Sequence, residues 1–534
     1  MTTEQARPGW VTEELTARWC GWVRRDAKRD EGREEGDGVE PLSAVAPFDL
    51  SPIAAVPTCT PDDVAQAVAG ARAARPQWAR MSLKRRGETV LAFHDLLLKR
   101  QDQVLDLIQW ETGKARYHAW MEVAQVATIA RHYARRAGHY LAPRRVRGMV
   151  PGATKVREVR VPKGVVGVIS PWNYPLYLGV GDVLPALMAG NAVVSKADSQ
   201  TALTLLWTRD LMAEAGLPTD LWQIVTGSGS VVGTALVDAA DYVCFTGSTT
   251  TGRSVGERAA RRLVGASLEL GGKNPLIVRA DADLAAAAAG TVTAAFANTG
   301  QMCIHIERVY VHEKVYDAFR DELERATQAL RLGPAYDYST DIGSLTSQAQ
   351  LASVQAHVDA AVDKGATVLV GGRPRPDLGP LFYEPTVLEG VTRDMDVCGD
   401  ETFGPVVSLY PYASDDEAVT LANEGNYGLS ASIWSKDTRA AARLAGRIRA
   451  GSVNINDGAA AAAGSIEAGM GGMGDSGLGR RHGAEGIRKY TESQTVATQR
   501  LLPLGPTKPE ENAVQSFIRR TNGQLALLRR LGVR

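Results

Sequence analysis

The chain has 534 residues, of which 44% are hydrophobic and 22% are charged. Because a single hydrophobic core stops growing near roughly 250–300 residues, this length predicts two or three domains. The formal net charge is zero, which argues against a nucleic-acid or membrane-surface role, since both usually need a basic face. The five cysteines are far apart and odd in number, so we expect neither a disulfide framework nor a metal site.

The N-terminal residues carry no secretory signal. The first ten, MTTEQARPGW, lack a basic region followed by an apolar one, and no apolar run reaches the roughly 20 residues of a membrane span. These features predict a cytoplasmic protein without a membrane partner. Residues 24–40 are charged and contain glycine, which indicates a solvated part of an N-terminal charged or helical segment, 1–44.

Strand and helix signals begin at residue 60. Thr60-Pro61-Asp62-Asp63 has the capping residue, proline and acids of a helix start. Short apolar runs then alternate with helical stretches such as 201–215, which Gly216 closes. This alternation predicts an α/β fold with a doubly wound parallel sheet. The predicted strands are 165–170, 191–196, 222–225 and 242–246.

A second α/β pattern follows residue 269. Its predicted strands are 275–278, 308–311, 366–370 and 451–456, with an alanine-rich helix at 282–297. Two sheets joined near Glu269 imply two lobes with a cleft between them. Outside both lobes, 156–161 and 495–500 alternate polar and apolar residues, which is typical of an extended arm.

Two glycine-rich stretches are candidate phosphate-binding turns. Thr226–Gly233 resembles a dinucleotide fingerprint, but its spacing is one residue too long, so an ordinary turn is the simpler interpretation. In Phe245–Arg253, Gly247 and Ser248 follow a strand and a helix can begin near Thr249. The N–H groups at such a helix start can face a pyrophosphate, although a plain strand-to-helix turn has the same pattern.

Three polar residues stand in unusual surroundings. Cys303 follows Gly, Gln and Met in a loop that can expose its sulfur, whereas Cys244 lies in an apolar strand and fits a buried hydrophobe. Glu269 lies between leucines, which favours either a salt-bridged residue or an acid with a shifted pKa. Asn173, in Pro-Trp-Asn-Tyr-Pro, would on its own be a turn residue.

Taken in order, the motifs resemble the aldehyde dehydrogenase superfamily over about residues 45–500. They are Pro171-Trp-Asn173, Lys196, Phe245-Thr-Gly-Ser248, Glu269-Leu-Gly-Gly-Lys273, Gly300-Gln-Met-Cys303, Glu401-Thr-Phe-Gly-Pro405 and the glycine-rich 471–477. Within that superfamily, 196–201 and 477–483 resemble the actinobacterial NADP-dependent succinate-semialdehyde dehydrogenase type.

The resemblance implies covalent catalysis. Cys303 would attack the aldehyde carbon, and the Asn173 amide and the Cys303 N–H would stabilise the oxyanion. After hydride transfer, Glu269 would activate the water that hydrolyses the thioester. A CoA-acylating relative commonly lacks this glutamate, and a non-catalytic binding protein on the same fold would need none of the three residues.

The resemblance also implies a cofactor site. Lys196 would contact the adenosine ribose or its phosphate, Gly247 and Ser248 the pyrophosphate, and Glu401 the nicotinamide ribose. The other expected contacts are Trp172, Asn173, Leu270 and Phe403. NAD-preferring members commonly have a glutamate three residues after the lysine; here that residue is Ser199, which favours NADP without excluding NAD. Asp198 is the residue that can restore a negative charge there.

The implied fold has a Rossmann-like cofactor domain (45–144 and 162–268) and an α/β catalytic domain (269–480). A β-strand oligomerisation arm (145–161 and 481–505) and a C-terminal tail (506–534) complete it. Since an isolated two-stranded ribbon is marginal in water, the arm needs a partner surface, and we expect a homodimer or homotetramer.

Succinate semialdehyde is the expected substrate, with uncharged aldehydes as the alternative. Relatives usually bind its carboxylate with two arginines, but the aligned residues here are Gly181 and Ala297. The loop 457–464 is small and almost uncharged, and His305 replaces a second cysteine, so a Cys-x-Cys redox switch is absent. If another cation binds the substrate carboxylate, we expect it to be Arg308.

Overall fold

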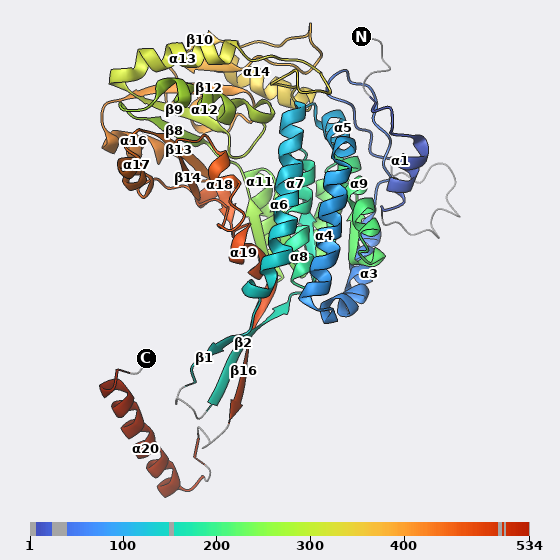
Figure 1. Ribbon diagram of the computed structural model, residues 1–534, viewed down its shortest axis with the longest axis vertical. Helices are drawn as coiled ribbons and strands as arrows, with labels where there is room; N and C mark the ends of the chain where they lie inside the picture. Colours follow the sequence, from blue (N-terminus) through green and yellow to red (C-terminus); the bar gives the residue numbers. More distant parts are fainter. Residues whose placement is uncertain (1–6, 24–39, 149–153, 500–504, 507–508, 533–534) are drawn as a thin grey trace. The chain divides into compact units, whose positions relative to one another are not determined.

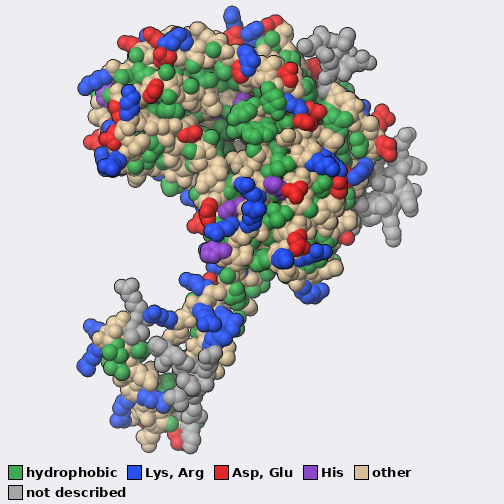
Figure 2. Space-filling view, in the orientation of Figure 1, with side chains coloured by type: hydrophobic (Ala, Val, Ile, Leu, Met, Phe, Trp, Pro, Cys, Tyr) green, Lys and Arg blue, Asp and Glu red, His purple; other side chains and the backbone are tan. Residues whose placement is uncertain are grey.

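The computed structural model describes residues 7–23, 40–148, 154–499, 505–506 and 509–532. The charged residues 24–39 therefore lie outside the described part. The chain divides into two compact units, residues 1–140 with 162–491, and residues 141–161 with 492–534. On the face of the first unit in view, side chains of both charges are interspersed (Figure 2).

The first unit contains a six-stranded sheet in the order β15-β7-β6-β3-β4-β5. All neighbouring strands are parallel except the edge strand β15, which pairs antiparallel with β7. The four strands predicted for the first lobe are confirmed. The bounds are β3 Val165–Ile169, β4 Ala192–Lys196, β5 Trp222–Val225, β6 Tyr242–Thr246, β7 Gly265–Glu269 and β15 Gly477–Leu478.

The register of this sheet brings the predicted site residues to one edge. Ile169 lies opposite both Lys196 and Phe245, and Thr246 lies opposite Glu269, so β3, β4, β6 and β7 end together. The connection from β3 leads to β4 on one side, whereas β6 leads to β7 on the other. Ligands of open α/β sheets bind where connections diverge in this way, here between the ends of β3 and β6.

Helices cover this sheet, and α4 and α6 pack side by side (Figure 1). The predicted helix start at Thr60 is confirmed, because its hydroxyl and the Asp63 carboxylate form a reciprocal capping box. The bounds are α1 Glu13–Cys20, α3 Pro61–Arg80, α4 Leu83–Lys99, α5 Gln101–Thr112, α6 Arg116–Tyr140, α7 Pro175–Val180, α8 Val183–Met188, α9 Ala202–Glu214, α10 Thr234–Ala239 and α11 Thr249–Arg261.

A seven-stranded sheet follows Glu269, in the order β10-β11-β12-β9-β8-β13-β14. It is parallel except for the edge strand β10. The four strands predicted for the second lobe are confirmed, and β11 to β13 are additional. The bounds are β8 Asn274–Val278, β9 Ile306–His312, β10 Thr367–Val370, β11 Thr386–Glu389, β12 Val406–Tyr412, β13 Ser430–Trp434 and β14 Ser452–Ile455.

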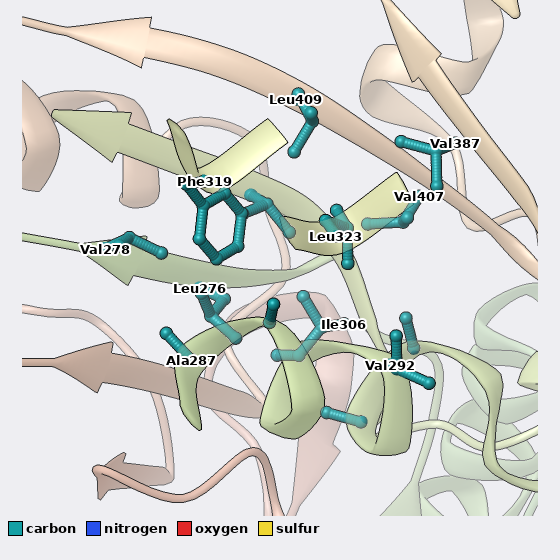
Figure 3. Close-up of a cluster of buried hydrophobic side chains, with 14 of the residues drawn as sticks. Leu276, Val278, Ala287, Val292, Ile306, Phe319, Leu323, Val387, Val407 and Leu409 are labelled. Carbon is teal, nitrogen blue, oxygen red and sulfur yellow. The ribbon is translucent and has the colours of Figure 1, made fainter. Parts of the chain in front are cut away.

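The core of this lobe lies between the sheet and helices α12 and α13. Phe319 and Leu323, one turn apart on α13, contact the same cluster as Ile306 of β9, and all three are fully buried (Figure 3). Burying such side chains contributes roughly 1.5–3 kcal/mol each. The helices of the lobe are α12 Leu284–Phe296, α13 Tyr316–Gln328, α14 Gln348–Asp363, α15 Asp396–Gly399, α16 Asp415–Ala422, α17 Thr438–Ala445 and α18 Ala460–Ala463. The helix α19 Gly483–Arg488 packs against α6 and α8 of the first lobe.

The second unit is small. It contains a three-stranded sheet in the order β1-β2-β16 and the helix α20 Glu511–Arg530. The strands are β1 Arg144–Val146, β2 Thr154–Pro162 and β16 Thr491–Gln499, so both predicted arm segments are strands up to residue 499. The domain boundaries and the arm's role in oligomerisation stay predictions.

Candidate active site

A cavity of about 260 Å³ in the first unit brings together Cys303, Glu269 and Asn173. These residues are up to 130 positions apart in the sequence. Asn173 follows β3, Glu269 ends β7, and Cys303 precedes β9. The described side chains around them are mainly apolar or small. They include Met121, Tyr174, Tyr177, Leu178, Ala294, Ala297, Met302, Ile304, Trp434, Ala459, Ala460, Ala463 and Met470.

The backbone before Cys303 is held in an unusual conformation. Asn298, Thr299 and Gly300 have consecutive positive φ values of 53°, 56° and 71°. Such angles cost free energy for residues with a side chain and persist only where the surroundings enforce them. Gly300 is required here, because an added Cβ would lie 1.9 Å from the carbonyl oxygen of Gly404. The loop thus fixes the position of Cys303 three residues later.

Asn173 is held against this loop by hydrogen bonds at both ends. Its side-chain amide donates to the Gln301 carbonyl at 3.0 Å, and its own carbonyl accepts from Lys114 Nζ at 2.6 Å. Lys114 in turn pairs with Glu122 at 2.6 Å, and both side chains are fully buried. The amide is therefore pre-positioned beside the cysteine loop, as an oxyanion donor must be.

The thiol of Cys303 is protonated in this site at neutral pH. Burial, together with the carboxylates of Glu401 and Glu269, raises the pKa of Cys303 to about 12, while its own backbone N–H opposes this rise. Since the thiolate is the nucleophilic form, the proton must leave as the sulfur attacks. A proton acceptor close to the sulfur is therefore required.

Glu269, in the same cavity, has the properties of a general base. It ends β7, is buried, and its Oε1 has no hydrogen-bond partner in the described part of the chain. Burial raises the pKa of Glu269 to about 7, although the charges of Arg481 and Lys489 oppose the rise. A carboxylate that titrates near neutral pH is suited to general acid–base catalysis.

Sequence reasoning missed the buried ionic cluster next to Glu269. Arg481 lines the cavity and bonds Asp182 at 2.7 Å, and Lys489 Nζ bonds the other oxygen of Asp182 at 2.8 Å. Although burial opposes ionisation, these two cations hold the pKa of Asp182 well below its usual value. Among the cations, Arg481 also does most to lower the pKa of both Glu269 and Cys303.

This cluster leads to a prediction about pH. Aldehyde turnover is expected to rise with pH through about 7, because Glu269 accepts protons only when ionised. Arg481→Met removes a charge that favours the ionised form, so the pH–rate profile should move to higher pH. Arg481→Lys should restore part of the original position. An unchanged profile in Arg481→Met would show that Arg481 does not act on the titrating group.

The predicted nicotinamide side of the site also comes together. Glu401 Oε1 accepts from the Gly272 N–H at 2.9 Å, which orients its carboxylate. The Trp172 and Phe403 rings meet edge to face at 5.7 Å, and Phe403 has a positive φ of 52°. Glu307, paired with Lys273, accepts from the N–H of Phe403 at 3.3 Å and so holds this conformation.

At the other end, the carboxyl edge of the first sheet fits a phosphorylated ligand. Lys196 ends β4 and is 5% exposed, and its ammonium group donates no hydrogen bond to any described residue. Ser248 caps α11, and the helix begins at Thr249 as predicted. Leu270 packs against Gly252 of the same helix, where an added Cβ would lie 2.3 Å from its Cδ2. A buried cation and a helix N-terminus at the same edge of the sheet suit a phosphorylated ligand.

Asp198 and Ser199 lie in the loop that follows β4. Asp198 accepts from the Gln200 N–H at 2.9 Å within its own turn, while its charge partly offsets that of Lys196. Ser199 is half-buried. Thr226–Gly233 forms a strand-to-helix turn on the same edge, in which Ser228 accepts from the Val231 N–H at 3.3 Å.

The proposed role for Arg308 is wrong. Its buried guanidinium donates to the carbonyls of Lys273, at 2.7 and 3.0 Å, and of Ala422, at 3.2 Å, and it does not line the cavity. Ala297 does line the cavity, as does Asp457 of the loop 457–464. Arg481 is therefore the cation that the described cavity offers, and Asp182 already pairs with it.

Comparisons with known proteins agree with this geometry. The family model "Aldehyde dehydrogenase family" matches residues 34–496, so the chain belongs to the aldehyde dehydrogenase family. A candidate NADP(+) succinate-semialdehyde dehydrogenase of Mycolicibacterium smegmatis is 52% identical over 84% of this chain and 87% of that protein. The 4,4'-diapolycopene aldehyde oxidase of a Methylomonas species is 37% identical over 87% of each chain.

Solved structures agree as well. Betaine aldehyde dehydrogenase from Staphylococcus aureus, in complex with NAD+, has a TM-score of 0.83 and 31% identity. The match covers 88% of this chain and 93% of that one. An NADP-dependent enzyme of E. coli has the same TM-score with 32% identity, covering 86% of this chain and 95% of that one.

Proposed function

We propose that this enzyme oxidises aldehydes to carboxylic acids with NADP, and also with NAD, through Cys303. The observation that carries the proposal is the presence of Cys303, Asn173 and Glu269 in one cavity. As the Cys303 thiol gives its proton to a water molecule, its sulfur attacks the carbonyl carbon, and the Asn173 amide and the Cys303 N–H hold the oxygen of the tetrahedral adduct. When bound, the oxidised nicotinamide accepts the hydride that this adduct releases.

The second half of the reaction depends on Glu269. Loss of hydride leaves a thioester on Cys303. Glu269 takes a proton from a water molecule, and the resulting hydroxide adds to the thioester carbon. The carbon–sulfur bond then breaks to release the carboxylic acid, and the proton held by Glu269 returns to the sulfur, which restores the thiol and the carboxylate. Transfer to coenzyme A would not need this base, so added coenzyme A should not raise the rate of NADPH formation.

The substrates that the cavity favours are uncharged aldehydes, with succinate semialdehyde accepted without strong selectivity. Its lining is largely apolar, its cation Arg481 is already paired with Asp182, and Asp457 adds a negative charge. A carboxylate without a free cationic partner is costly to desolvate. Succinate semialdehyde remains the second candidate, because several relatives at 50–52% identity carry that name.

A comparison of two aldehydes of similar length tests this proposal. We expect pentanal and succinate semialdehyde to have kcat/KM values within about 100-fold of each other, a difference of some 2.7 kcal/mol at most. If succinate semialdehyde were preferred beyond that ratio, and Arg481→Met removed the preference, the Arg481 guanidinium would be the carboxylate-binding group and the apolar assignment would be wrong.

Cofactor preference leads to a second prediction. Ser199→Glu should lower kcat/KM for NADP by about tenfold or more and spare NAD, because like charges about 4 Å apart repel by roughly 1–4 kcal/mol in a partly solvated site. Ser199→Ala is the matched control and should change both values little. Equal losses with both cofactors would mean that residue 199 only shapes the pocket.

We also propose a homodimer or homotetramer in the cytoplasm. The exposed strand β16 supports an oligomer, since its unpaired edge needs a partner. The five free cysteines support the cytoplasm, since thiols stay reduced there. A monomeric mass by light scattering at micromolar concentration would contradict the oligomer.

A further inference from the structure

Helix α20 is an amphipathic segment outside the region that the family model matches. The match ends at residue 496, and α20 covers Glu511–Arg530. None of its residues is buried, and Ile518, Leu525 and Leu527 are 49%, 46% and 55% exposed. A water-exposed helix with large apolar side chains requires a partner surface or a role in binding.

The apolar residues of α20 lie on one face. The stripe consists of Val514, Phe517, Ile518, Leu525 and Leu528. From Val514 these residues follow at intervals of three, one, seven and three positions, which is the pattern of a helical stripe. At 100° per residue their side chains span about 100° of the helix circumference, and Leu527 lies outside this stripe.

The charges of α20 are almost all positive. Arg519 and Arg530 lie opposite the stripe, whereas Arg520 and Arg529 border it, and Glu511 in the first turn is the helix's acidic residue. Hydrophobic and basic side chains lie together over this part of the chain (Figure 2). The neutral total charge of the protein conceals this local basic segment, so the expectation of no membrane-surface role does not hold for it.

We propose that α20 binds the surface of an anionic lipid bilayer, with its apolar stripe among the acyl chains and its arginines at the headgroups. A segregated apolar face, a basic polar face and low overall hydrophobicity are the features of helices that lie in the interface. The described helices include none long and apolar enough to cross a membrane. The anionic leaflet of a cytoplasmic membrane supplies the complementary charge.

Pairing with α20 of a second copy fits the residues less well. In a parallel pair joined through the stripe, Arg520 and Arg529 would border the interface, and each would lie near the same positive charge of the second copy. Thr521 occupies the seam between Ile518 and Leu525, and Gly523 weakens an isolated helix by roughly 1 kcal/mol. A bilayer avoids the charge repulsion and stabilises the helix along its whole length.

Vesicle flotation of the full-length enzyme tests the proposal. We expect binding to vesicles of phosphatidylserine and phosphatidylcholine at about 0.1 M salt, and binding at least about tenfold weaker to phosphatidylcholine alone. Ile518→Ser with Leu525→Ser removes two apolar side chains of the stripe without changing the charge, and should abolish flotation. The matched control, Gln515→Ser with Asn522→Ser, changes two residues outside the stripe, also without changing the charge, and should keep binding within about threefold.

Two further readouts keep the result unambiguous. Both double variants should form NADPH from a soluble aldehyde at the rate of the unaltered enzyme, which shows that they are folded. The proposal is overturned if the enzyme does not float with anionic vesicles, or if both vesicle types bind it equally. It is also overturned if the apolar-face variant keeps full binding to anionic vesicles. A fall in the molar mass of this variant's assembly by light scattering would overturn it as well, because the stripe would then join copies of the chain.

Discussion

Cys303→Ala is expected to lower aldehyde turnover by at least about 10³-fold while leaving NADP binding nearly unchanged. Without the sulfur no thioester forms, and the remaining groups of the cavity supply only binding and oxyanion stabilisation. NADPH formation measures the first effect, and fluorescence titration with NADP the second. Because Cys303 is half-buried among small and apolar groups, the methyl side chain is accommodated without a change of fold.

Cys20→Ala is the matched control for this substitution. Cys20 ends α1, and its thiol donates to the Ala55 carbonyl at 3.8 Å, away from the cavity. Its replacement should leave turnover unchanged. If Cys303→Ala kept more than a few per cent of the original rate, the nucleophile would have to be another group.

Glu269→Gln should separate the two halves of the reaction. An amide cannot accept a proton from water, so one equivalent of NADPH per active site should form rapidly and steady turnover should then be about 10²–10⁴-fold slower. Stopped-flow absorbance of NADPH records both phases. The side chain is buried and its Oε1 has no partner among the described groups, so the isosteric amide breaks no hydrogen bond at that atom.

Asp457→Asn removes a different carboxylate from the same cavity and serves as the control. The amide oxygen can still accept from the Ala461 N–H, which Asp457 Oδ1 binds at 2.9 Å. Steady turnover of an uncharged aldehyde should change by no more than a few-fold. Loss of the burst itself in Glu269→Gln would instead place Glu269 in the first half-reaction, as the base that takes the Cys303 proton.

The strands and helix starts were predictable because they depend on local patterns. Strands such as Tyr242–Thr246 are buried on both faces of a parallel sheet, so their sequences are almost continuously apolar. Thr60 was identifiable as a helix cap because a short polar side chain satisfies an N–H group three residues on. The residues of the candidate site followed from the order of the motifs, of which those at Lys196 and Glu269 end strands of the first sheet.

The ionic cluster was not predictable, because its members are distant in the sequence. Asp182 and Arg481 are 299 residues apart, and neither position has a local pattern that indicates a buried partner. The Lys114–Glu122 pair that holds Asn173 was missed for the same reason. Arg308 was misassigned because proximity in sequence to Cys303 does not show which way a strand residue points, and its side chain binds backbone carbonyls instead.

Mass spectrometry of the peptide that contains Cys303 tests the central claim most directly. Glu269→Gln enzyme, mixed with NADP and an aldehyde and quenched in acid after the burst, should carry one acyl group on that cysteine, because thioester hydrolysis is the slowed step. The same peptide from Glu269→Gln with Cys303→Ala should be unmodified. A burst of NADPH without an acyl group on Cys303, or with the acyl group on another residue, would contradict the mechanism.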